Sequence, residues 1–261
     1  MATRRPLGTA LLTALTILAG GISCANALRP HPPPPRVDLR LLAEEKSPGL
    51  HPRDISWPRL KEPLSRMLVY SACLGPLLDN YHGLFGVLTY REGLPFVLRL
   101  QDQVVLKTAL WVPPLFGLAG VVMSALVLLL DRQLGSPPAS IRPSWSKVFY
   151  GIAFFSSQYY LSGLLDFLGV DSLLIHLVLA SLAIAGWTIF DATLAGLLLG
   201  IATAVAGPLA EVLLTSQGLY TYSHADVLGV CSWIPWVYFL GAPAVGNLAR
   251  RTCLDSQRQT K

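Results

Sequence analysis

Apolar runs of about 20 residues recur along the chain from Met67 onward, separated by short polar segments. A helix needs about 20 apolar residues to cross ~30 Å of hydrocarbon, so each run has the length of a membrane span. Lipid offers no partners to backbone N–H and C=O groups, which favours helix throughout such runs. The pattern predicts an all-α fold, a polytopic membrane bundle of about six transmembrane helices. The predicted spans are 67–90, 104–130, 148–167, 173–190, 192–215 and 227–248.

The composition supports this prediction. Hydrophobic residues make up 52% of the 261 residues and charged residues 13%, with a mean hydropathy of +0.51. A soluble domain carries about 25% charged residues, because its surface must be hydrated. The net charge of +5 gathers at the chain ends and in one loop, which is a topology signal and does not indicate a nucleic-acid partner.

The first 65 residues differ from the rest. Residues 1–27 combine Arg4 and Arg5 with an apolar run that ends in Ala25-Asn26-Ala27, the pattern of an N-terminal targeting segment. A cleaved signal peptide, an uncleaved anchor and a transit peptide all stay open. Residues 28–65 are expected to be a Pro-rich disordered linker. The transmembrane domain is predicted at 66–251, with a polar C-terminal tail at 252–261.

The loops predict an orientation. The loop 131–147 and the tail carry Lys and Arg, whereas the loops 168–172 and 216–226 carry neither. Even-numbered spans therefore end on the cytosolic side, as does the C terminus. Arg250 and Arg251 are expected outside the hydrocarbon. The basic linker would share the cytosolic side, which conflicts with a cleaved secretory signal. A stromal location after a transit peptide, or a re-entrant first span, would remove the conflict.

Enzyme signatures are absent from the sequence. It has no zinc-protease, serine-hydrolase, phosphate-loop or dinucleotide-binding motif, and its four cysteines are far apart. The sequence predicts no enzyme, no metal site and no cofactor. Asp79 and His82 are the exception: three residues apart, they would share one face of an unbroken helix and bind a proton or a ligand hydroxyl. Alternatively, Gly75-Pro76 and Gly83 break the helix, and the two groups lie in polar protein or water at the break. Glu211 is expected to reach interfacial water.

A polar-aromatic stripe follows one face of the third span. Its members are Phe155, Gln158, Tyr159, Ser162 and Asp166. Aromatic area with one or two hydrogen bonds suits a flat apolar ligand that carries a hydroxyl, although ordinary helix packing gives the same periodicity. Phe155, Tyr159 and Ser162 are the predicted ligand-binding residues, in a cavity among the third, fourth and fifth spans.

The fifth span contains Gly196-x-x-x-Gly200, a spacing of small residues typical of close helix packing in membranes. The partner helix can belong to this bundle or to another protein.

Separated motifs in the last 150 residues resemble those of the insulin-induced gene (Insig) family. The second span carries Trp111-Val112-Pro113-Pro114 and ends in Asp131-Arg132-x-Leu134-Gly135; the fourth ends in Trp187-Thr188-x-Phe190-Asp191. The most specific stretch runs from Gly218-x-Tyr220-x-Tyr222 through Ser232-Trp233-x-Pro235 to Gly246-Asn247 and Arg250. The likeness covers about residues 104–251.

The resemblance implies a six-helix protein of the endoplasmic reticulum membrane that binds oxysterol and takes part in cholesterol homeostasis. Its implied partners are a sterol-sensing membrane protein such as the escort protein Scap, and HMG-CoA reductase. Phe155 matches a phenylalanine that lines the sterol site, and Asp191 matches the aspartate needed for escort binding. Two roles stay open for Asp191: its carboxylate caps the fifth helix by accepting backbone N–H groups, or it is exposed and recognised by a partner.

The sequence departs from the family after Asp191, where the family has Arg-Ser-Arg-Ser and this chain has Ala192-Thr193-Leu194-Ala195. The N-terminal segment resembles that of an algal, plant or protist relative, with a plastid membrane as the alternative location. The leading hypothesis is a lipid-sensing membrane regulator that is not an enzyme. The alternatives are an intramembrane transporter or enzyme built on Asp79 and His82, and a structural membrane protein without a ligand.

Overall fold

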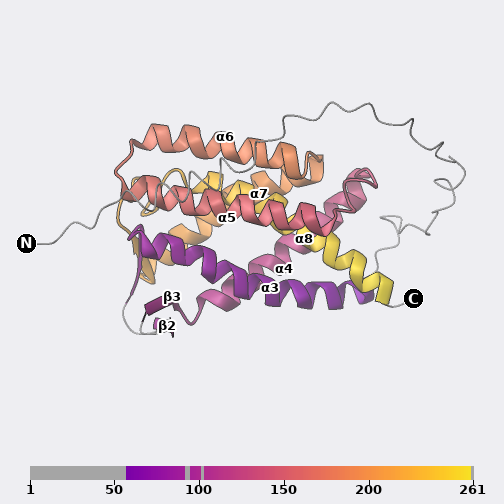
Figure 1. Cartoon of the computed structure of the whole chain (residues 1–261), viewed down its shortest axis with the longest axis horizontal. Coiled ribbons are helices and arrows are strands. Elements are labelled where there is room, and N and C mark those ends of the chain that lie inside the picture. Colours follow the sequence, from indigo (N-terminus) through magenta and orange to yellow (C-terminus); the bar gives the residue numbers. More distant parts are fainter. Residues whose placement is uncertain (1–56, 92–94, 101–102, 260–261) are drawn as a thin grey trace, which may run out of the picture. The chain divides into compact units, whose positions relative to one another are not determined.

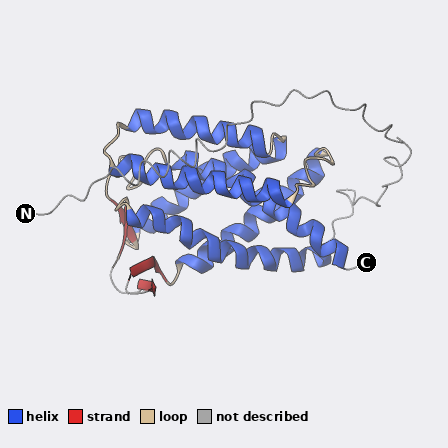
Figure 2. Ribbon diagram, in the orientation of Figure 1, coloured by secondary structure: helices blue, strands red, loops and turns tan. Residues whose placement is uncertain are grey.

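The computed structural model describes residues 57–91, 95–100 and 103–259. Six helices in these ranges form a bundle (Figures 1 and 2), which confirms the predicted fold class. Their bounds are α3 (Trp57–Leu84), α4 (Val112–Leu134), α5 (Trp145–Phe167), α6 (Ser172–Phe190), α7 (Leu194–Ser216) and α8 (Ile234–Gln259). The predicted targeting segment 1–27 and the linker up to residue 56 lie outside the described residues.

Two small antiparallel sheets lie where α3 ends and α4 begins. β2 (Pro95–Leu100) and β3 (Gln103–Ala109) form a hairpin, visible beside the ends of α3 and α4 in Figure 1. β1 (Leu88–Tyr90) pairs with β4 (Tyr220–Tyr222), although about 130 residues separate them in sequence. Because this pairing joins the end of α3 to the segment before α8, it closes one end of the bundle.

Successive helices alternate in direction, so the bundle has two distinct ends (Figure 1). The strand end holds the four strands and the α5–α6 turn. The basic end holds the start of α3, the α4–α5 loop, the α6–α7 junction and the last turns of α8. The Lys and Arg of the predicted cytosolic loops, Arg132, Arg142, Lys147 and Arg251, belong to the basic end. The structure therefore groups the segments whose charges predicted one membrane side.

Helix α8 lies at the centre and packs against all five other helices. Many of its core positions are small, including Ala242, Ala244 and Ala249, which are at most 3% exposed. Small residues let helix backbones approach closely where lipid provides no hydrophobic drive for association. The closest pair is α3 and α4: a Cβ added to Gly75 would lie 2.2 Å from Phe116 Cγ, and one added to Gly120 would lie 1.9 Å from Ser71 Oγ.

Three helices, α4, α6 and α7, are long and apolar enough to span a membrane. Their outward faces carry exposed large apolar side chains, such as Leu177 and Ile184 of α6 and Val205 and Leu213 of α7. These faces suit hydrocarbon and would be unfavourable in water. The bounds of α5, α6 and α7 agree with the predicted third, fourth and fifth spans to within three residues.

The second and sixth spans were predicted to start too early. Residues 104–109 belong to strand β3, and α4 starts at Val112; residues 227–233 form a loop before α8 starts at Ile234. The cause is proline in both cases. Pro113 and Pro114 fit only the first turn of a helix, where their missing N–H groups have no intrahelical role, and Pro235 constrains α8 in the same way.

The first span also differs from its prediction. Helix α3 starts at Trp57 and ends at Leu84, so residues 57–65 of the predicted disordered linker are helical. Leu60 and Met67 are at most 3% exposed and pack in a core that includes Ala249 and Cys253 of α8. The prolines and charges around these residues hid the apolar face. The predicted polar tail is likewise helical as far as Gln259.

Candidate functional site

A mainly apolar cavity of about 320 Å³ lies among α3, α4, α5 and α8. This volume is within the range of ~300–1,000 Å³ that small-molecule sites occupy. Phe116 of α4, Phe155 of α5 and Val237 of α8 contribute to its wall. Leu74 and Leu77 of α3 also line it and are 38% and 46% exposed, so the cavity reaches the outer, lipid-facing surface of the bundle.

Two of the three predicted ligand-binding residues, Phe155 and Tyr159, line this cavity. The predicted location was wrong, because α6 and α7 contribute no lining residue. Ser162 was also placed wrongly: it is not a lining residue, and its Oγ donates to Tyr159 O (2.7 Å) and lies 2.9 Å from His82 Nε2. Gln158, on the neighbouring face, donates to Leu179 O of α6 (2.9 Å). The stripe therefore divides between the cavity and helix packing.

A carboxylate–tyrosine cluster lies at the strand end of the cavity; its members are Asp79, Glu211, Tyr90, Tyr159, Tyr222 and Tyr238. Asp79 accepts from Tyr90 and, at 3.1 Å, from Tyr159. Glu211 accepts from Tyr222 and, at 2.6 Å, from Tyr238. The β1–β4 pairing supplies one tyrosine to each carboxylate, because Tyr90 lies opposite Tyr220 and Leu88 lies opposite Tyr222.

The tyrosines in this cluster act as proton donors. Burial raises the pKa of Tyr90, and the nearby Asp79 charge raises it further. Burial likewise raises the pKa of Tyr222, with Glu211 as the second cause. Both phenols therefore stay protonated at neutral pH and can hold the carboxylates by hydrogen bonds. Glu211 is 8% exposed, so the expectation that it reaches interfacial water was wrong.

Helix α3 runs unbroken through Gly75-Pro76, which excludes the predicted break. Asp79 and His82 are both buried, 9% and 0% exposed, but each has its own partners. The Ser162 hydroxyl donates its only proton to Tyr159 O, so it can only accept from His82. This favours the His82 tautomer in which Nε2 carries the hydrogen and donates to Ser162 Oγ. Within the part of the chain that the structure describes, no three His, Cys, Asp or Glu side chains could hold a metal ion together.

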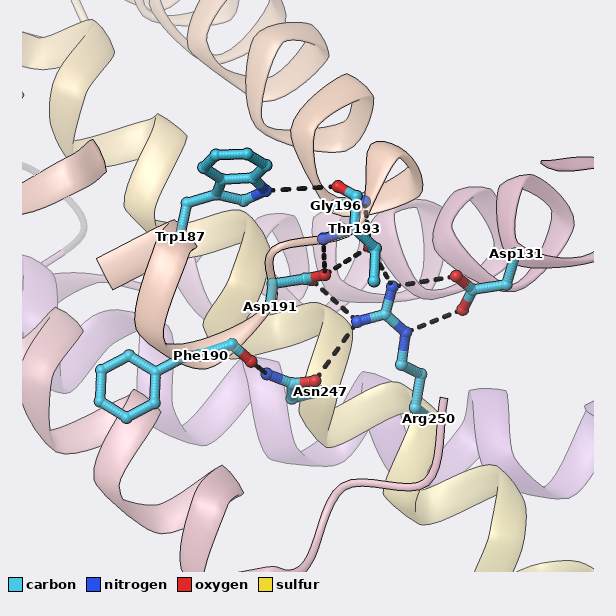
Figure 3. A network of polar contacts seen from close by, with 8 residues as sticks. All are labelled: Asp131, Trp187, Phe190, Asp191, Thr193, Gly196, Asn247 and Arg250. Carbon is cyan, nitrogen blue, oxygen red and sulfur yellow. Dashed lines mark hydrogen bonds and ion pairs between the residues drawn. The ribbon is translucent and has the colours of Figure 1, made fainter. Parts of the chain in front are cut away.

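The basic end contains a buried ion-pair network, shown in Figure 3. Arg250 of α8 forms two hydrogen bonds to Asp131 of α4, at 2.8 and 3.0 Å, and one of 2.8 Å to Asp191 at the α6–α7 junction. Arg250 is 1% exposed, and both carboxylates are at most 5% exposed. The two hydrogen bonds to Asp131 form a bidentate pair, the geometry that suits a planar guanidinium and a carboxylate. Asn247 adds a bond from its amide to Phe190 O (2.7 Å).

Three sequence expectations fail at this network. The Asp191 carboxylate is not exposed, since it pairs with Arg250 and accepts from Thr193 N (3.1 Å). The cap of α7 is Thr193, whose hydroxyl accepts from Gly196 N (2.9 Å). Arg250 does not extend out of the bundle as its charge suggested, because two carboxylates compensate it inside. The exposed residues of this junction are Ala192 and Leu194.

The two glycines of the fifth span pack within the chain. A Cβ on Gly196 would lie 2.3 Å from the Asp191 carboxylate, and one on Gly200 would lie 3.0 Å from the Phe239 ring of α8. Gly196 thus gives the network the space it needs, and Gly200 lets α7 approach α8.

Three motifs far apart in the sequence meet at the network. Asp131 belongs to the motif at the end of the second span, Trp187 and Asp191 belong to the motif at the end of the fourth, and Arg250 is the last residue of the C-terminal motif (Figure 3). Trp187 Nε1 donates to Thr193 O, at 3.3 Å, and supports the turn that carries Asp191. Sequence spacing does not predict that these residues touch, because it does not determine which helices are neighbours.

A family model for insulin-induced protein (INSIG) matches residues 85–253. The chain belongs to the INSIG family. The matched part includes the whole ion-pair network and most of the cavity wall outside α3.

Individual INSIG relatives agree with this assignment. The chain is 34% identical over 156 residues to insulin-induced gene 1 protein of Xenopus tropicalis, covering 60% of this chain and 61% of the frog protein. It is 34% identical over 150 residues to insulin-induced gene 2 protein of Gallus gallus, covering 58% and 65% of the two chains. The match thus spans less than two thirds of these relatives.

The fold agrees with the crystal structure of a mycobacterial Insig homologue, MvINS of Mycobacterium vanbaalenii. The TM-score is 0.62 over 76% of this chain and 96% of MvINS, at 19% sequence identity. A cross-linked MvINS trimer gives the same TM-score at 20% identity. At this identity the likeness supports the six-helix architecture alone.

Proposed function

We propose that this INSIG-family chain is a membrane regulator of sterol or isoprenoid metabolism that acts by binding and not by catalysis. It holds a sterol or a similar apolar lipid in the cavity among α3, α4, α5 and α8. Lipid binding changes how it retains membrane partners of the same metabolism, of the kind represented by Scap or HMG-CoA reductase. Its proposed location is the endoplasmic reticulum membrane, with a plastid membrane as the alternative.

The apolar cavity carries this proposal. Its wall offers aromatic area from Phe116 and Phe155 and only a few polar side chains, as a flat apolar ligand with a small polar group requires. Leu74 and Leu77 bring it to the lipid-facing surface, so a ligand can enter from the bilayer without crossing water. A ligand that binds a closed conformation of the bundle more tightly than a looser conformation shifts the population toward the closed one. Such a shift would change how the bundle binds a partner.

The α6–α7 junction is the proposed partner surface. The Asp191 side chain is buried, so it would act by holding the shape of the turn whose exposed residues are Ala192 and Leu194. This junction lacks the basic, serine-bearing segment that follows the aspartate in the family resemblance. We therefore propose that the partner of this chain contacts an apolar turn here.

The ligand part of the proposal is tested by Phe155→Ala. Removing the ring deletes buried apolar area from the cavity wall and should weaken sterol or isoprenoid binding by ~1–2 kcal/mol, about 5- to 30-fold in Kd. The measurement is binding of radiolabelled sterol to the purified chain. Phe149→Ala is the matched control, because Phe149 lies on the same helix but is 69% exposed and outside the cavity. Equal affinities for the two variants would contradict the proposed site.

A further inference from the structure

Two tyrosines that line the cavity have already used their only proton. Tyr159 donates to Asp79 Oδ1 at 3.1 Å, and Tyr238 donates to Glu211 Oε1 at 2.6 Å. Ser156, a third lining hydroxyl, donates to Ile152 O at 2.8 Å within α5. These three lining residues of α5 and α8 therefore have oxygen atoms that can accept a hydrogen bond but no free proton to donate.

The carboxylates are fixed in this role by the fold. Their second contacts come from Tyr90 and Tyr222 of the paired strands β1 and β4. Among the described residues, neither Asp79 nor Glu211 forms an ion pair with Lys, Arg or His. A buried carboxylate without a cation depends on hydrogen-bond donors, so it holds the tyrosine protons strongly.

A phenol that donates to a carboxylate becomes a better acceptor, because consecutive hydrogen bonds polarise one another in a low-dielectric interior. A ligand hydroxyl or amine could donate to the Tyr159 or Tyr238 oxygen. A ketone, an ester or a carboxylate placed there would bring an acceptor oxygen against the tyrosine oxygen, which is also an acceptor. The ligand oxygen would lose its hydrogen bonds to water and gain none. The remaining polar lining residues, Ser71 and Tyr81, belong to α3.

We propose that Asp79 and Glu211 are positioning residues for ligand specificity: through Tyr159 and Tyr238 they make the polar end of the cavity an acceptor site that selects lipids with a hydrogen-bond-donating head. This inference rests on the proposed function and narrows its ligand class. It assigns the two buried acids a role in selecting the ligand's head group, although neither of them lines the cavity.

The test uses three probes that share one ring system: cholestanol, the matched 3-ketone cholestanone, and the 3-amine. Binding of each to the purified full-length chain is measured in detergent or nanodiscs. The alcohol and the amine should each bind about tenfold more tightly than the ketone, the factor expected for one hydrogen bond. Equal affinity for alcohol and ketone would overturn the inference and leave the proposed function intact. Failure of all three probes to bind would instead count against the proposed function itself.

Two variants test the acids' role. In Glu211→Gln the amide can donate to Tyr238, which frees the tyrosine proton for the ligand, so the alcohol-to-ketone ratio should fall to about threefold or less. Tyr238→Phe removes the acceptor and should lower alcohol binding to the level of the ketone while leaving the ketone unchanged. Tyr160→Phe is the matched control: Tyr160 adjoins Tyr159 but is 39% exposed and outside the cavity. An unchanged ratio in both Glu211→Gln and Tyr238→Phe would refute the assignment.

Discussion

At the scale of single residues, the bundle depends on buried charges that are matched inside the protein. Arg250 lies between Asp131 and Asp191, and these three side chains join α4, α8 and the α6–α7 junction. An unpaired charge away from water costs several kcal/mol, whereas a paired and hydrogen-bonded one is tolerated. The network therefore fixes which helix ends are neighbours. Substituting its different side chains should lower the free energy of unfolding by different amounts.

Arg250→Ala should be the most harmful change at this site. It leaves two buried carboxylates without their cation and should lower the free energy of unfolding by ~3–5 kcal/mol. Asp191→Asn should keep the fold, because Arg250 still binds Asp131 through two hydrogen bonds. The same variant should lose partner capture, since the turn at Ala192 loses its ionic anchor. The measurements are thermal unfolding in detergent and co-purification with a Scap-like or reductase-like partner.

Arg251→Ala is the control for this pair. Arg251 is the next residue along α8, and its ion pair with Asp255 is partly exposed, with side chains 18% and 23% exposed, so it should be worth only ~0–1 kcal/mol. A stability loss in Arg251→Ala equal to that in Arg250→Ala would contradict the network's role. Full partner capture by a folded Asp191→Asn variant would show that Asp191 serves the fold alone.

Residue types in the site were easier to predict than their partners. Phe155 and Tyr159 could be named from a three-to-four residue periodicity, because a helix puts such positions on one face. Periodicity gives no information on which helix that face meets, so the cavity was assigned to the wrong neighbours. Glu211 was expected at the interface because it lies about one turn from the end of its predicted span; its partner Tyr238, 27 residues away in sequence, could not be foreseen.

At the scale of elements, the contact between α3 and α4 is set by glycine. Gly75 faces Phe116, and Gly117 and Gly120 face the backbone and side chains of α3. Gly83 lies on the same helix as Gly75, and a Cβ added there would meet nothing within 4 Å. Both glycines therefore lie in α3, but only Gly75 is in close contact with another helix.

We predict opposite effects for the two substitutions. Gly75→Ala forces the Phe116 ring or the helices apart and should cost ~1–3 kcal/mol of stability. Gly83→Ala should be neutral or should gain up to ~1 kcal/mol, because alanine is the better helix former. Midpoints of thermal unfolding, measured on the purified chain, compare them. Equal midpoints would mean that the close approach of α3 and α4 has no energetic weight.

Apolar runs identified the helices well and their starts poorly. The three described helices that are long and apolar enough to span a membrane, α4, α6 and α7, all correspond to predicted spans. Helix α3 extends to Trp57 because tertiary packing of Leu60 against α8 outweighs the polar composition of its first turns. The β1–β4 pairing had no signal in the sequence: strands of three residues carry too little pattern to be recognised.

At the scale of the whole bundle, the two ends differ in chemistry. The basic end carries loop cations and the Arg250 network; the strand end carries the carboxylate–tyrosine cluster. Lys and Arg remain preferentially on the cytosolic side of a membrane. An even number of helices places the start of α3 and the end of α8 together, as Figure 1 shows.

This arrangement predicts the membrane orientation. A tag after residue 261 should be digested by protease added to sealed vesicles of native orientation, because the basic end faces the cytosol or stroma. A tag in the exposed turn at Ser223–Asp226, on the strand end, should be protected. The opposite pattern would invert the assignment of both ends.

The proposed lipid site predicts where a bound sterol touches the chain. A photoreactive sterol, activated after binding to the purified protein in nanodiscs, should label peptides of α3, α5 and α8 that line the cavity, and excess unlabelled sterol should suppress the labelling. Mass spectrometry should place the labels near Leu78, Phe155 and Val237. Labelling confined to the outer faces of α6 and α7, or unaffected by competitor, would contradict a lipid-binding regulator built around this cavity.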